Sequence, residues 1–351
     1  MLQMAQPVTE RDLRQSLLAG LQETLPTGWR AAFSPGRPSD DPEINGVLDL
    51  VAPTGARSQA RVEFKARLEP AQLAREMPWL TKSAASLVVA PRISARARSL
   101  LNEAGVSWYV PDGDYRIAIG GLFIERLVDQ SKRRSAETPH TRFVADPFAG
   151  GALKVVRWLL IDPGRSWSIA NMAERTGLTL GFVSRTFKTL ARDAYVERVR
   201  GATRLTDRNA LLDAWAAAPT PKDSAFERVA TVEGPEALLR TIRAITAPRR
   251  YAITAEAAAE RIAPFARFSR VEIYVDDVAS WDRALDLTAV PRGGNLVLIK
   301  PVNAGVFDGS FERDAVLLTS RPQLYVDLVR RGGAAAEAAT FMRERGELWR
   351  Q

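Results

Sequence analysis

The spacing of the hydrophobic positions between residues 152 and 207 predicts three helical segments followed by two short strands. Apolar residues recur at spacings of three and four from Leu153 and Val156 onward, and the same spacing returns in the next two segments. A glycine-containing break ends the second segment, and Thr179 stands where it can cap the third. A hairpin with its turn at Gly201 completes the pattern.

The third segment separates an apolar face from a polar one. Val183, Phe187 and Leu190 repeat at helical spacing, which predicts a face turned towards a core. Three helices followed by a hairpin are typical of a winged helix-turn-helix, whose second motif helix enters the major groove of DNA. The predicted DNA-binding residues are Thr179, Gly181, Ser184, Arg185, Lys188 and Arg192 of the helix, with Arg198, Arg200 and Arg204 of the wing.

Charge supports this interpretation. Residues 152–208 hold 11 Lys and Arg against 5 Asp and Glu, a net charge of +6, while the whole chain has +8 and a sequence pI of about 10.0. A basic surplus concentrated in one small module predicts a polyanionic partner, here double-stranded DNA. The alternative is a winged helix that makes only protein contacts, with a solvated basic face.

Composition excludes several kinds of site. The chain has 351 residues, enough for two or three domains, and contains no cysteine. Disulfides and thiolate metal sites are therefore excluded, and a single histidine, His140, argues against a His-rich zinc site or a Ser-His-Asp triad. We find neither a signal peptide nor an apolar run of 18 residues. We therefore expect a cytoplasmic protein without a membrane partner.

The remaining pattern predicts an α/β (α+β) multidomain chain. Residues 8–128 alternate helices and strand-like runs, as in an α/β domain. A polar, basic segment over 129–150 indicates a linker, and the winged helix-turn-helix domain covers 151–217. A second linker follows at 219–224, and 225–351 form a C-terminal α/β domain.

The first domain carries a row of charged residues on strand-like segments. Asp49 lies on one predicted strand, and a preceding helix bears Glu10. Glu63 and Lys65 lie two positions apart on the next strand, so alternation places them on the same face. This order resembles the PD-(D/E)xK, restriction-endonuclease-like fold. The resemblance implies Asp49, Glu63 and Glu10 as Mg²⁺ ligands and Glu63 and Lys65 as catalytic residues, because two carboxylates can hold the ion while a lysine activates water.

We favour a nuclease-like fold retained for DNA or partner binding, so that the protein is not an enzyme and DNA binding needs no cofactor. The alternative is a metal-dependent nuclease using Asp49, Glu63 and Lys65, which would need Mg²⁺. An outward-facing polar row on an ordinary hairpin would give the same pattern.

The last block carries a series of short apolar motifs. They are YAIT at 251–254, VEIYVDD at 271–277, GNLVLI at 294–299 and TSRPQLYVDL at 319–328. Downstream of a winged helix, this order resembles the AbiEi antitoxins of type IV toxin–antitoxin systems and related regulators, over residues 152–351. Without a carboxylate pair or a glycine-rich phosphate loop, we expect a packing or dimerisation domain, with Ser320, Arg321 and Gln323 as helix caps and surface residues.

The AbiEi resemblance implies a transcriptional regulator whose winged helix binds promoter repeats. It also implies a C-terminal domain that counteracts a nucleotidyltransferase-type toxin without a stable complex. Those antitoxins usually begin with the winged helix, whereas about 150 residues precede it here, which favours a regulator with an added domain. Arg185 is the best placed residue for bidentate guanine recognition, and a palindromic operator would require a homodimer.

Overall fold

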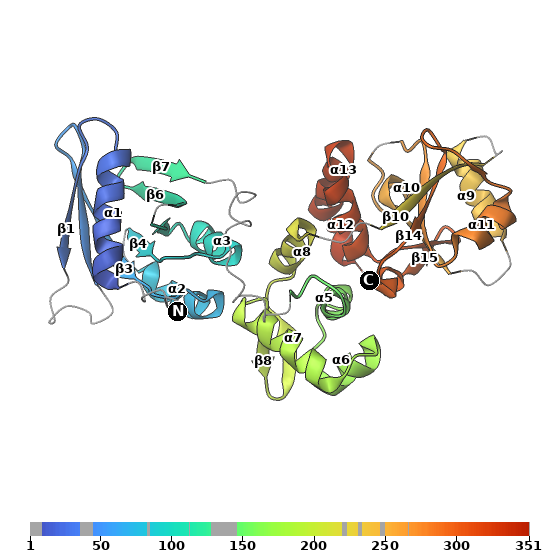
Figure 1. Ribbon diagram of the computed structural model, residues 1–351, viewed down its shortest axis with the longest axis horizontal. Coiled ribbons are helices and arrows are strands. Elements are labelled where there is room, and N and C mark those ends of the chain that lie inside the picture. The colour runs from blue at the N-terminus through green and yellow to red at the C-terminus, as the bar shows by residue number, and fades with distance from the viewer. Residues whose placement is uncertain are drawn as a thin grey trace, which may run out of the picture. The chain divides into compact units, whose positions relative to one another are not determined.

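The computed structural model describes residues 9–35, 45–82, 85–111, 113–127, 146–219, 223–230, 234–245, 250–265 and 267–350. The predicted linker at 129–150 therefore lies largely outside the described residues. The described chain is a mixed α/β structure with two compact units (Figure 1), one before residue 144 and one from residues 144–191 and 195–351. Each unit is considered by itself below.

A seven-stranded mixed sheet forms the centre of the first unit. Its strands lie in chain order, with antiparallel pairs at both ends and parallel pairs β3–β4 and β4–β5 in the middle. The parallel pairs need helical crossovers, which the sequence supplies between these strands. The strands are β1 (Arg30–Pro35), β2 (Gly46–Val51), β3 (Arg57–Phe64), β4 (Ser86–Val89), β5 (Ser107–Tyr109), β6 (Tyr115–Ile119) and β7 (Leu122–Arg126).

Helices cover both faces of this sheet. The helix α1 (Glu10–Thr24) packs Leu13, Leu17 and Leu21 onto one face, while α2 (Pro70–Leu80) and α3 (Ala95–Glu103) share a second core on the other. Thr9 caps α1, since its side chain accepts from the Asp12 amide. Because both faces are covered, the side chain of Glu63 is buried, unlike a residue on the outer surface of a hairpin.

The second unit begins with three helices and a hairpin, as predicted. They are α5 (Ala152–Ile161), α6 (Ile169–Thr176), α7 (Leu180–Arg192), β8 (Val196–Val199) and β9 (Ala202–Leu205), here called the three-helix module. Gly177 ends α6 at a φ of 69°, a backbone conformation that costs glycine little, and the Thr179 hydroxyl accepts from the Phe182 amide at 3.3 Å. Trp167 exchanges two backbone hydrogen bonds with Thr203 and so extends the hairpin.

A second seven-stranded sheet follows the helix α8 (Arg208–Ala217). Its spatial order is β13-β10-β14-β12-β11-β16-β15, with both parallel and antiparallel pairs. The strands are β10 (Ser224–Val229), β11 (Tyr251–Thr254), β12 (Val271–Val275), β13 (Thr288–Ala289), β14 (Leu296–Lys300), β15 (Phe311–Arg313) and β16 (Val316–Leu318). The sequence pattern missed β10, whose start falls in the predicted second linker.

One continuous apolar core joins the three-helix module to this C-terminal sheet. The core contains the buried faces of α5 and α7 together with residues of the sheet strands and of the C-terminal helices. The module and the sheet are therefore parts of one packed unit. The C-terminal helices are α9 (Pro235–Ala244), α10 (Ala255–Ile262), α11 (Val278–Leu285), α12 (Arg321–Arg331) and α13 (Gly333–Glu344).

Candidate functional site

The two faces of α7 have the separation that its sequence predicts. Val183, Phe187 and Leu190 are fully buried, whereas Gly181, Arg185 and Lys188 are exposed and Ser184 is half-buried. Burial of the apolar face holds the helix in place, so the opposite face is presented from a rigid element. We call the exposed surface of residues 179–192 the α7 face.

Of the six cations predicted to bind DNA, four have no acidic partner in the described part of the chain. They are Arg185 and Lys188 on α7, and Arg198 and Arg200 at the tip of the hairpin. By contrast, Arg204 pairs with Glu197 across the hairpin at 2.5 Å, and Arg192 pairs with Asp193 at 3.1 Å. The structure therefore leaves Arg185, Lys188, Arg198 and Arg200 more available to an external anion than Arg192 and Arg204.

The tip of the hairpin is a two-residue turn. Arg200 has a φ of 46° and Gly201 a φ of 84°, and Val199 pairs with Ala202 directly before the turn. Positive φ at both central positions is the type I′ arrangement that matches the twist of a hairpin. This turn carries the side chain of Arg200 at the end of the wing, where it is exposed.

The position of Arg157 corrects the count of cations that the sequence assigned to a DNA-binding surface. Arg157 counts among the cations of residues 152–208, yet it is 4% exposed and donates from Nε to Oε1 of Gln323 at 2.9 Å. Its guanidinium also stacks over Trp215, and burial lowers the pKa of Arg157 to about 10. This charge belongs to the interior of the second unit and adds nothing to the α7 face.

The charged row of the first unit is an ion-pair cluster. Lys65 Nζ forms an ion pair with Glu63 and lies 3.1 Å from an oxygen of Glu76 on α2, and Glu63 is 8% exposed. Burial lowers the pKa of Lys65, but the hydrogen bonds and charges of Glu63 and Glu76 together outweigh burial, so the pKa is raised. The ammonium group thus lies against both carboxylates and balances one of their two negative charges.

Asp49 and Glu10 are not brought to Glu63 as a metal site. Asp49 pairs in register with Gln59 and accepts from its side chain at 2.6 Å, and Gln59 precedes Glu63 by four positions, about 13 Å along the strand. Glu10 instead accepts from Asn45 Nδ2 at 3.2 Å. Within the described residues no group of three or more His, Cys, Asp or Glu side chains could hold a metal ion, so Asp49, Glu63 and Glu10 are not assembled into one metal site.

A cavity of about 1050 Å³ lies in the second unit, between the three-helix module and the C-terminal sheet. Asp327 lines it, accepting from Thr254 at 2.6 Å, Gln323 at 2.8 Å and Tyr274 at 3.2 Å. Desolvation outweighs these bonds and raises the pKa of Asp327 to about 6. The expectation that Gln323 is a surface residue is wrong, since it is 3% exposed and connects Asp327 to Arg157.

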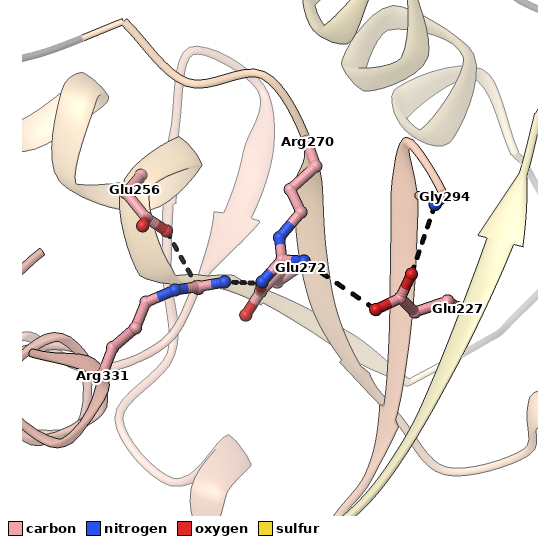
Figure 2. Close-up of polar contacts among 6 residues, drawn as sticks. All are labelled: Glu227, Glu256, Arg270, Glu272, Gly294 and Arg331. Carbon is pink, nitrogen blue, oxygen red and sulfur yellow. Dashed lines mark hydrogen bonds and ion pairs between the residues drawn. The ribbon is translucent and has the colours of Figure 1, made fainter. Parts of the chain in front are cut away.

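Figure 2 shows a second charged group on the cavity wall. Glu272 of β12 accepts from Arg270 at 2.9 Å and also pairs with Arg331, which contacts Glu256 at 3.0 Å. Burial raises the pKa of Glu272 to about 7, Arg270 opposes this rise, and the charges of Glu256 and Asp327 add to it. Glu272 and Glu256, which are 16 positions apart in the sequence, are thus linked through the guanidinium of Arg331.

The comparison with protein families bears on this same part of the chain. Residues 204–346 match a family model. Its description is "Transcriptional regulator, AbiEi antitoxin, Type IV TA system". The match covers less than half of the chain. No curated protein and no solved structure matches the chain significantly.

The AbiEi match begins in β9 and ends just after α13, so it contains the C-terminal sheet and most of the cavity wall. The three helices of the module and the whole first unit lie outside it. The predicted resemblance is thus supported for the C-terminal part of the range 152–351. No helix within the described ranges is long and apolar enough to cross a membrane.

Proposed function

We propose that this protein is a transcriptional regulator that recognises duplex DNA through a winged helix-turn-helix formed by the three-helix module. The observation that carries the proposal is the α7 face, where Arg185 and Lys188 are exposed without an acidic partner in the described chain. A rigid helix with unpaired cations suits a polyanion better than a neutral protein partner. The AbiEi match adds the regulatory class but not the mode of binding.

In the proposed complex α7 lies in the major groove, which is wide enough to admit a helix. Its first turn points to base edges, and Arg185 is placed for bidentate contact with guanine. Arg198 and Arg200 extend the contact from the hairpin to the phosphate backbone, where they add affinity without sequence information. Arg192 and Arg204 must first break their ion pairs with Asp193 and Glu197, so we expect them to contribute less to DNA affinity.

The test is an incubation of the full chain with plasmid and short duplexes, with Mg²⁺ or with EDTA, read for both mobility shift and cleavage. The proposal expects a shift that weakens steeply with added salt, as counterion release requires. Arg283→Ala is the control, because Arg283 is an exposed arginine of α11. If Arg185→Ala shifts the duplex as well as this control does, α7 is not part of the interface. EDTA-sensitive cleavage lost in Glu63→Ala would instead make the first unit a nuclease.

A second candidate function is antitoxicity. It is favoured by the position of the AbiEi match, which covers the C-terminal sheet and leaves out α5, α6 and α7. This function would reside in residues 204–346 and would not need the α7 face. Co-expression with a nucleotidyltransferase toxin tests it, since protection that survives Arg185→Ala would separate antitoxicity from DNA binding.

A further inference from the structure

The α7 face contains one large apolar side chain. Leu180, the first residue of α7, is 58% exposed and does not pack against the core of the second unit. Leu178, two residues earlier, does pack against that core. Solvent exposure of a leucine is common by itself, so its position on this particular face is what matters.

The neighbours of Leu180 are polar or cationic. Ser184 and Lys188 follow at one and two helical turns along the same line, and exposed Thr179 and Gly181 flank it. Gly181 has no side chain that could shield Leu180, and the guanidinium of Arg185 extends alongside that glycine. Leu180 is therefore an accessible apolar side chain at the start of a polar line that ends in a cation.

This setting indicates what can cover Leu180. A second copy of the same face would bring like charges together, which opposes self-association here. The major groove of DNA combines negative charge with one apolar group among its base edges, the C5-methyl of thymine. Residues in the first turn of a recognition helix are those that reach base edges.

We propose that Leu180 is a specificity-determining residue that contacts the methyl group of a thymine in the bound duplex. This inference rests on the proposed function, since it requires α7 in the major groove. Leu180 supplies apolar contact with thymine, while Arg185, five positions later, donates hydrogen bonds to guanine. The α7 face then distinguishes sequences that combine the two bases at a fixed spacing.

The experiment starts by selecting the preferred duplex of the full chain from a random pool. Each thymine of that duplex is then replaced by uracil, which removes only the methyl group, and affinity is measured by fluorescence anisotropy. We expect one thymine whose methyl removal weakens binding about fourfold, the effect of exposing one methyl-sized group to water. In Leu180→Ala the same replacement has no effect, and Leu180→Met retains it.

Val302→Ala is the matched control, because Val302 is 64% exposed in the same unit but lies outside α7, and it must keep the uracil effect. Sequence-specific binding that no uracil replacement weakens overturns the assignment, as does a uracil effect that persists in Leu180→Ala. Failure of the wild type to bind any duplex in a salt-sensitive way overturns the proposed function and this inference with it. The two failures are thus distinguishable.

Discussion

Arg157 on α5 donates a hydrogen bond from Nε to Oε1 of Gln323 on α12, at 2.9 Å and across 166 residues of sequence. Gln323 in turn donates from Nε2 to Asp327, so a single amide side chain connects a buried guanidinium with a carboxylate. The bond joins the first helix of the three-helix module to the C-terminal part of the same unit. Arg157, Gln323 and Asp327 all line the cavity, so this chain of hydrogen bonds runs along its wall.

Replacing Gln323 by leucine tests this connection. The change removes the acceptor of the Arg157 Nε hydrogen bond and one of the three donors to Asp327, which keeps Thr254 and Tyr274. An unsatisfied buried polar group costs about 1–3 kcal/mol. We expect the second unit to lose that much stability and the peptides of α5 and α12 to exchange amide hydrogens faster. Hydrogen exchange of the full chain measures both, with Glu337→Gln on the exposed side of α13 as control. Protection unchanged from the wild type would show that the bond contributes nothing.

Glu272 gives the second unit a specific pH dependence. Its pKa of about 7 in the folded chain exceeds the ordinary value of 4.5, so the folded state holds the proton more tightly than the unfolded state. Glu272 therefore lowers stability as pH rises from about 4.5 to about 7, by up to about 3 kcal/mol, and has no further effect above that range. The groups facing it are Arg270, Arg331, Glu256 and Asp327.

Glu272→Gln should remove this contribution. Denaturation measured every half pH unit from 4 to 8 would show the stability difference, wild type minus variant, falling as pH rises through this window. The charge-free amide keeps the shape of the side chain, so the difference isolates the proton. A difference that stays constant, or that grows with pH, would contradict the raised pKa.

Local periodicity predicted most helices and strands, because helix faces and caps depend on neighbours a few residues away. The burial of Val183, Phe187 and Leu190 opposite an exposed cationic face is the clearest case. Leu180 was missed, although its place on the polar line with Ser184 and Lys188 is visible in the sequence. Its exposed fraction of 58% shows that it does not pack against the core of the second unit.

What the sequence could not predict depends on long-range pairing. Alternation predicted which face of its strand Glu63 occupies, but the register that places Asp49 opposite Gln59 is set by pairing along the whole hairpin. The strand β10 escaped because Glu227 and Arg228 interrupt its apolar pattern; Arg228 is held by Asp282 at 2.7 Å, 54 residues away. A charge count likewise cannot tell a buried arginine from an exposed one.

Lys65→Met tests the ion-pair cluster of the first unit. Removing the ammonium leaves Glu63 and Glu76 as partly buried carboxylates without their shared partner, so we expect a loss of about 1–3 kcal/mol of stability. The double variant Glu63→Gln with Lys65→Met should recover part of it, because one of the two charges is then gone. Unchanged stability together with loss of Mg²⁺-dependent cleavage would instead assign Lys65 a catalytic role.

Arg185 and Arg200 should differ in the kind of binding they support. Arg185→Ala should weaken binding to the preferred duplex by about 1–3 kcal/mol and leave a random duplex little changed, because a base contact discriminates between sequences. Arg200→Ala should weaken both duplexes alike and lower the salt dependence by about one phosphate contact, since a backbone contact does not discriminate. Anisotropy titrations on the two duplexes at several salt concentrations measure both effects, with Arg283→Ala as control. Equal losses on both duplexes for Arg185→Ala would move this residue from base recognition to the phosphate backbone, while α7 would still lie against DNA.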